Sequence, residues 1–89
     1  MNSQAKSNLM LLRRLGPSPH ADGRQTVALN GCPDIFEGSD KNFYVIGIDR
    51  TDELRGKLPE DASCGPDERI IEVPRQTLVL AKADIPDRM

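Results

Sequence analysis

Carboxylates are the residues of this 89-residue chain whose types and spacing come nearest to a reactive site. Asp34, Glu37, Asp40 and Asp49 lie close together in the chain. Paired carboxylates carry out acid–base catalysis, and clusters of them bind hard metal ions. At turns and strand ends, however, carboxylates usually accept backbone hydrogen bonds or face solvent. We therefore expect no catalytic residue, and a small-ligand or enzymatic pocket built from Asp34, Asp49 and nearby arginines stays an alternative.

The two cysteines and the single histidine add little chemistry. Cys32 would need a neighbouring base to act as a nucleophile, and the only histidine, His20, lies in a predicted linker. We expect Cys32 to be a packing residue. The sequence contains no Cys-x-x-Cys pair, no glycine-rich phosphate loop and no Gly-x-Ser-x-Gly motif. These residues predict a protein without a metal or other cofactor, and favour a non-enzyme over an enzyme.

A β-hairpin is the element that would position the carboxylates. Two apolar runs, residues 34–37 and 42–49, flank the polar turn Gly38-Ser39-Asp40-Lys41-Asn42, and all three aromatic residues fall in this stretch. The second run is apolar on both faces, which is typical of a central, buried strand. We expect Ile46 to be a core anchor and Gly47 to mark a bulge or a close packing contact.

Later segments are suited to covering the hairpin. Thr51 is a good N-cap for a short helix that Pro59 would end. Residues 69–73 are typical of a strand, and residues 75–83 favour a helix over a fourth strand. Residues 26–29 are either an edge strand or the end of a linker. The sequence thus predicts an α+β fold, with a small three- to four-stranded, mostly antiparallel sheet and one or two short helices on one face.

Charge divides the chain into two parts. Residues 1–30 carry four basic and one acidic side chain, a net charge of +3, whereas residues 31–89 carry eight basic and thirteen acidic ones, a net charge of −5. An acidic body is a poor nucleic-acid platform. The basic part has helical spacing over residues 1–15, followed by glycine and proline breakers. We predict a mobile basic arm over residues 1–25, one domain over residues 26–86 and a tail over residues 87–89.

The apolar run near the start is too short to cross a membrane. Leu9-Met10-Leu11-Leu12 is closed by Arg13-Arg14, and neither its length nor its flanks fit a secretion signal. We therefore expect a cytoplasmic protein with reduced cysteines.

Three short motifs carry a resemblance to other proteins. They are CPDIFE at residues 32–37, FYVIG at residues 43–47 and ERIIEVP at residues 68–74. In this pattern the chain resembles small bacterial proteins of unknown function, over about residues 32–74. The resemblance implies a prokaryotic, cytoplasmic domain in a regulatory setting, and it brings no catalytic residues with it.

These observations favour a small interaction or regulatory module that binds a protein partner through a sheet edge or a helix face. The first hairpin strand is an open edge unless residues 26–29 pair with it. Asp34, Ile35, Phe36 and Glu37 are therefore the predicted partner-binding residues. Their carboxylates would favour a basic surface, on a different protein or on a second copy. An obligate homo-oligomer subunit is a further alternative.

Overall fold

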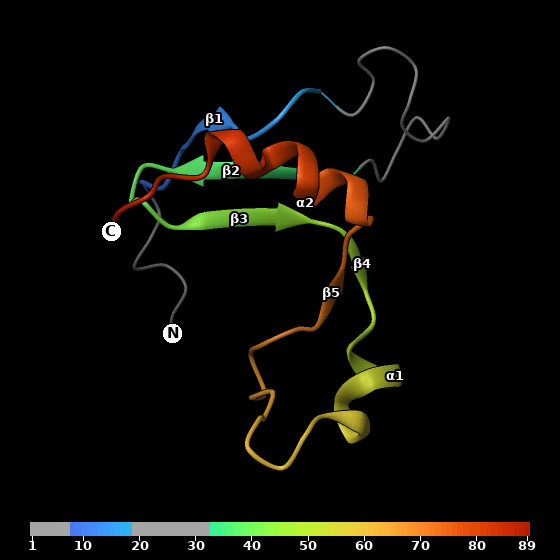
Figure 1. Ribbon diagram of the computed structural model, residues 1–89. Coiled ribbons are helices and arrows are strands. Elements are labelled where there is room, and N and C mark those ends of the chain that lie inside the picture. Colours follow the sequence, from blue (N-terminus) through green and yellow to red (C-terminus); the bar gives the residue numbers. More distant parts are fainter. Residues whose placement is uncertain (1–7, 19–32) are drawn as a thin grey trace.

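The computed structural model describes residues 8–18 and 33–89 (Figure 1). A three-stranded antiparallel sheet contains β1 (Leu11–Arg14), β2 (Asp34–Gly38) and β3 (Phe43–Ile46), in that order. A two-stranded sheet pairs β4 (Ile48–Asp49) with β5 (Ile71–Glu72). Helices α1 (Thr51–Leu54) and α2 (Arg75–Ala81) each continue into a short 3₁₀ turn, Arg55–Lys57 and Lys82–Asp84. The α+β class is confirmed.

The predicted hairpin is confirmed, and its turn has a clear local cause. Gly38 N–H donates to the carbonyl of Asn42 (2.9 Å), and Lys41 N–H donates to the carbonyl of Gly38 (3.0 Å). Lys41 takes the left-handed conformation, with φ of 72°. The carboxylate of Asp40 stabilises the turn, because it accepts hydrogen bonds from Asn42 N–H (3.0 Å) and from the Tyr44 hydroxyl (2.6 Å).

The prediction for the N-terminal segment is wrong. Residues 11–14 form β1, a strand of the sheet, and are neither part of a helix over residues 1–15 nor of an arm outside the domain. Arg13 pairs with Glu37, and the register shifts between Leu11 and Arg13. An isolated helix of this length is marginal, whereas β2 supplies backbone partners and opposite charges. The possible strand at residues 26–29 lies outside the described residues.

Residues 42–49 form two strands rather than one, and the third predicted strand lies in a separate sheet. The break occurs at Gly47, where β5 crosses close to the chain (Figure 1). A Cβ atom on Gly47 would overlap the carbonyl oxygen of Glu72 and lie 2.6 Å from Ile71 Cγ2. Gly47 therefore marks a close packing contact, which is one of the two alternatives that the sequence predicted; the other was a bulge.

Gly47→Ala is expected to lower the free energy of unfolding by about 1–3 kcal/mol, because a backbone oxygen cannot move aside for the added methyl group. Gly56→Ala is the matched control, since a Cβ there meets nothing within 4 Å. The control should stabilise the protein by about 0.4–1 kcal/mol. Urea denaturation of both variants measures the difference, and equal midpoints would contradict the packing assigned to Gly47.

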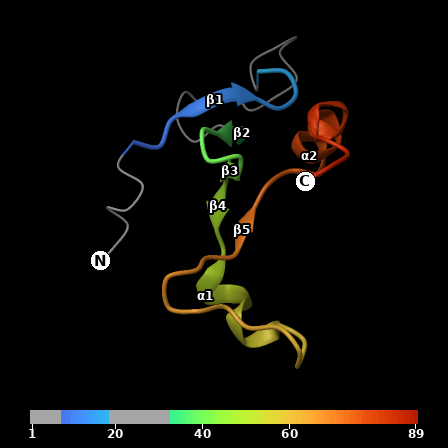
Figure 2. The same ribbon diagram turned by 90° about the vertical axis from the view of Figure 1, so that its left-hand side faces the viewer.

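Helix α2 covers one face of the three-stranded sheet (Figure 2). It follows Pro74, which suits the start of a helix, and confirms the helix predicted over residues 75–83. Three apolar residues are buried in the described part. Ile35 lies in β2, Ala81 lies in α2, and Leu15 directly follows β1. This small cluster is the core that joins the helix to the sheet.

Ile46 is not the core anchor that its sequence neighbourhood predicted. Its side chain is 47% exposed. Ile46 is opposite Asp34 in the β2–β3 register, and Ile35 is opposite Val45. Neighbouring side chains point to opposite faces of a sheet, so Ile46 lies on the face away from Ile35 and α2. Apolar residues on both faces of β3 therefore reflect an uncovered surface rather than a central position.

Candidate protein-interaction surface

The four predicted partner-binding residues lie together in β2, but β2 is not an edge. It is the central strand, because β1 fills the side that the sequence left open. Ile35 is buried in the core at 5% exposure, and Asp34 is nearly as buried at 7%. Phe36 and Glu37 are half-buried. The premise of an open edge at Asp34–Glu37 is therefore wrong, since a segment of the chain itself lies there.

Charge holds β1 on this strand. Arg14 Nε donates to both carboxylate oxygens of Asp34 (2.9 Å each), and Arg13 Nε donates to Glu37 Oε1 (2.6 Å). The guanidinium of Arg14 also stacks 5.2 Å from the ring centre of Phe36. The bias of Asp34 and Glu37 toward a basic partner is thus satisfied by arginines within the chain.

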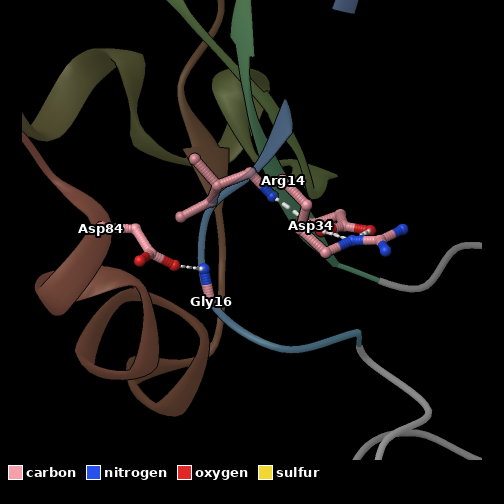
Figure 3. A network of polar contacts seen from close by, with 5 residues as sticks. Arg14, Gly16, Asp34 and Asp84 are labelled. Atoms are coloured by element: carbon pink, nitrogen blue, oxygen red, sulfur yellow. Dashed lines mark hydrogen bonds and ion pairs between the residues drawn. The ribbon is translucent and has the colours of Figure 1, made fainter. Parts of the chain in front are cut away.

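A second set of contacts joins the end of β1 to the end of α2. Figure 3 shows Gly16 meeting Asp84 on the helix side, whereas Arg14 and Asp34 point away from the helix. Gly16 N–H donates to Asp84 Oδ2 (2.7 Å), and Arg13 Nη2 donates to the Asp84 carbonyl (2.9 Å). Gly16 has φ of +81°, and a Cβ on it would lie 3.0 Å from the carbonyl oxygen of Leu80. These contacts make β1 part of the packed body.

The sheet has two edges, β1 and β3; β1 carries Arg13 and Arg14, whereas the outer edge of β3 is uncharged. No strand within residues 8–18 and 33–89 pairs with it. Gly38 N–H bonds to the Asn42 carbonyl, so the alternating pattern directs the backbone groups of Tyr44 and Ile46 toward β2. The N–H and C=O groups of Phe43 and Val45 then point outward. We call these outward groups, with residues 43–46, the β3 edge.

Apolar side chains surround the β3 edge. Phe43 is 43% exposed and Val45 is 47% exposed, on the face that α2 partly covers. A groove of about 660 Å³ lies beside Phe43, and Ile85, Pro86 and Met89 of the chain terminus form part of its wall. The large apolar side chains that stay exposed in the described part are Met10, Leu11, Leu12, Phe43, Val45, Ile46, Ile48, Leu54, Ile71, Leu78, Val79, Ile85 and Met89.

Sequence reasoning missed the β3 edge because it assigned the strand to the centre. One signal was available: residues 42–48 carry no charge and no proline, which are the devices that normally protect an edge strand. A second signal was the Arg13-Arg14 pair, which matches the carboxylates of β2 in an antiparallel register. Together these signals favour the strand order β1-β2-β3, with β2 in the centre, over an order in which β2 is an edge strand.

Asp49, proposed with Asp34 for the pocket alternative, has a structural role in the other sheet. Its carboxylate accepts the N–H of Thr51 (2.9 Å), and Arg69 lies 3.8 Å away. Thr51, expected to be an N-cap, is instead the first residue of α1, and its hydroxyl accepts Ile70 N–H (2.7 Å). Asp34 lies in the three-stranded sheet and binds Arg14, whereas Asp49 lies in the two-stranded sheet next to Arg69.

The ion pairs around Asp49 tie α1 to the two-stranded sheet. Arg50 donates to Glu72 (2.7 Å) and to Glu53 (3.1 Å), and these carboxylates raise the pKa of Arg50. Hydrogen bonds from Thr51, with a smaller contribution from the charge of Arg69, lower the pKa of Asp49. The arrangement orders the β4–α1 junction.

Asp49 makes the junction sensitive to acid. Because its pKa is lowered in the folded state, its stabilising contribution is fully present above the unfolded value of about 3.9 and is lost as pH falls through the folded pKa. The difference in unfolding free energy between the wild type and Asp49→Asn should therefore shrink as urea denaturation is moved from neutral to acidic pH. Asp61→Asn, in a surface loop, is the control. A difference that stays constant with pH would contradict the role of Asp49.

Other chemistry finds little support among the residues that the structure describes. In that part of the chain, no three His, Cys, Asp or Glu side chains gather where they could hold a metal ion. Cys64 donates its thiol to the Glu68 carbonyl (3.3 Å) and is a free cysteine. Cys32 and His20 lie outside the described residues. None of the described helices has the length and apolar character needed to span a membrane.

Comparisons of the chain with protein-family models, with curated proteins and with solved structures found no match.

Proposed function

We propose that this protein is a small interaction module, without catalytic activity, that binds a protein partner through the β3 edge. The resemblance to small bacterial proteins adds a prokaryotic, cytoplasmic and regulatory setting to this proposal. Its main support is that only three apolar residues are buried in the described part, whereas thirteen large apolar side chains remain exposed there. Exposed apolar surface next to unpaired strand groups is typical of a docking surface.

The β3 edge supports this proposal better than β2 or α2 does. The acidic groups of β2 are already bound by Arg13 and Arg14. Helix α2 has only seven residues, and it uses one face to cover the sheet. β3, in contrast, offers backbone donors and acceptors together with apolar side chains on both faces. The enzymatic alternative has weaker support, because Asp34 and Asp49 each serve a structural ion pair.

A tagged copy, cross-linked and captured from its native host, tests the proposal. The wild type should retain a protein, either another polypeptide or a copy carrying a second tag. Val45→Pro removes one outward N–H without touching the β2 ladder, and should reduce retention by about tenfold. Lys57→Ala, in the 3₁₀ turn after α1, is the matched control and should retain the partner fully. A wild type that retains neither another protein nor its own copy would contradict the proposal.

A further inference from the structure

The β3 edge has a pattern that is complementary to itself. Its outward backbone groups belong to Phe43 and Val45, two positions apart, with Tyr44 between them. When a second β3 is placed antiparallel, Phe43 of each copy lies opposite Val45 of the other, and both pairs exchange N–H···O=C hydrogen bonds. Tyr44 then lies opposite Tyr44 on the two-fold axis, as a pair that forms no backbone hydrogen bonds. The outward N–H and C=O groups of one copy are therefore hydrogen-bonded by the same groups of the second copy.

We propose that a second copy of this chain docks on the β3 edge, so that two three-stranded sheets join into one six-stranded sheet with a two-fold axis at Tyr44. This inference rests on the proposed function, and it names the partner. Two-fold dimers with the same patch on both subunits are the commonest oligomers. Six strands is also an ordinary size for a sheet.

Charge favours a second copy as the occupant. Residues 42–48 are uncharged, so two identical strands meet there without repulsion. Lys41 precedes this stretch and Asp49 follows it. Asp49 already lies in the β4–β5 sheet beside Arg69, so the pairing stretch itself, residues 43–46, meets its copy without any charge.

Packing favours the same arrangement. On the face beside α2, Phe43 and Val45 would cover each other across the axis, and both are now nearly half exposed. On the other face, Ile46 of each copy would lie beside Asn42 of the other, while each Tyr44 ring lies over Gly38 of its own β2 and donates its hydroxyl to Asp40. Aromatic and β-branched cross-strand pairs of this kind stabilise antiparallel sheets. The dimer would therefore cover apolar area that one copy leaves in water.

Disulfide trapping of full-length protein tests this register. In a Cys32→Ser, Cys64→Ser background, Tyr44→Cys places two thiols at a pair whose Cα atoms are about 4.5 Å apart, within disulfide range. Ile46→Cys is the matched control, because its two copies would be about 14 Å apart. We expect mild oxidation to cross-link Tyr44→Cys at least about tenfold faster than Ile46→Cys, since only the first pair meets the geometric limits.

Sedimentation equilibrium of the unmodified protein completes the test. The wild type should approach twice its chain mass of 9.8 kDa with rising concentration. Val45→Pro and Phe43→Lys should stay monomeric while keeping the wild-type circular dichroism spectrum. A wild type that is monomeric at about millimolar concentration, where weak complexes form, overturns the inference. So does a dimer in which Tyr44→Cys cross-links no faster than Ile46→Cys, although association as such, and with it the proposed function, would stand.

Discussion

Leu15→Ala is expected to lower the free energy of unfolding by about 2–5 kcal/mol. Leu15 is 4% exposed and shares the buried cluster with Ile35 and Ala81. It also directly follows β1, and its N–H donates to the Ile35 carbonyl (2.9 Å). Truncation leaves a cavity where β1, β2 and α2 meet. Because the described part has so few buried apolar residues, this loss is a large share of a small domain's stability.

Leu12→Ala is the matched control, since Leu12 lies in the same strand and is 64% exposed. It should change stability by less than about 0.5 kcal/mol, as surface substitutions usually do. Urea denaturation at one fixed protein concentration measures both, because association makes the midpoint depend on concentration. Equal effects of the two substitutions would show that β1 does not pack as a strand between core and solvent.

Asp34→Ala should cost about 2–4 kcal/mol, because the side chain accepts three hydrogen bonds and is nearly buried. Two come from Arg14 and one from the backbone N–H of Ile35 (3.1 Å). The side chain of Arg14 is 40% exposed, so water replaces part of the lost ion pair and keeps the cost below that of a fully buried pair.

Glu37→Ala is the control for charge alone. Glu37 pairs with Arg13 at 2.6 Å, but both side chains are partly exposed, and the expected cost is about 0.2–1 kcal/mol. A double-mutant cycle of Asp34→Ala with Arg14→Ala isolates the energy of the ion pair. A coupling energy near zero, with equal losses for Asp34→Ala and Glu37→Ala, would mean that Asp34 does not hold β1 in place.

Local patterns in the sequence were enough to predict the elements whose causes are local. The turn at residues 38–42 follows from glycine and short polar side chains, and α2 follows from Pro74 and good helix formers. Gly47 was recognised as a special position, and the structure explains it by the approach of β5. For the turn and for α2, the residues that decide the conformation are neighbours in the chain, whereas the contact at Gly47 comes from Ile71 and Glu72 of β5.

The pairing of β1 with β2 depends instead on residues far apart in the chain. Leu9-Met10-Leu11-Leu12 has no period that distinguishes a strand from a short helix. The deciding contacts come from Asp34 and Glu37, which lie in another segment. The sequence-based interpretation took these carboxylates as a docking site for another chain, whereas in the structure they bind Arg13 and Arg14 of the same chain. The sequence therefore predicted β2 to be an edge strand, whereas it is the central strand between β1 and β3.

The exposure of β3 likewise depends on segments that are far from it in the chain. A strand that is apolar on both faces is central when other elements cover both faces. This chain supplies α2 for one face, and no other described helix covers the second. Sequence alone does not show whether a cover comes from the same chain or from another copy. The apolar residues on the open side of β3 are therefore exposed within one copy, and the proposed association would cover them.

Amide hydrogen exchange on β3, followed by NMR at rising protein concentration, is the most direct measurement of strand pairing at this edge. Tyr44 and Ile46 donate toward β2 and should be protected at every concentration. Phe43 and Val45 point outward, so their amides should exchange rapidly in dilute protein and become protected as two copies pair. The gain in protection should follow the rise in sedimentation mass. If Phe43 and Val45 exchange equally fast at all concentrations while the mass doubles, the copies do not meet at the β3 edge.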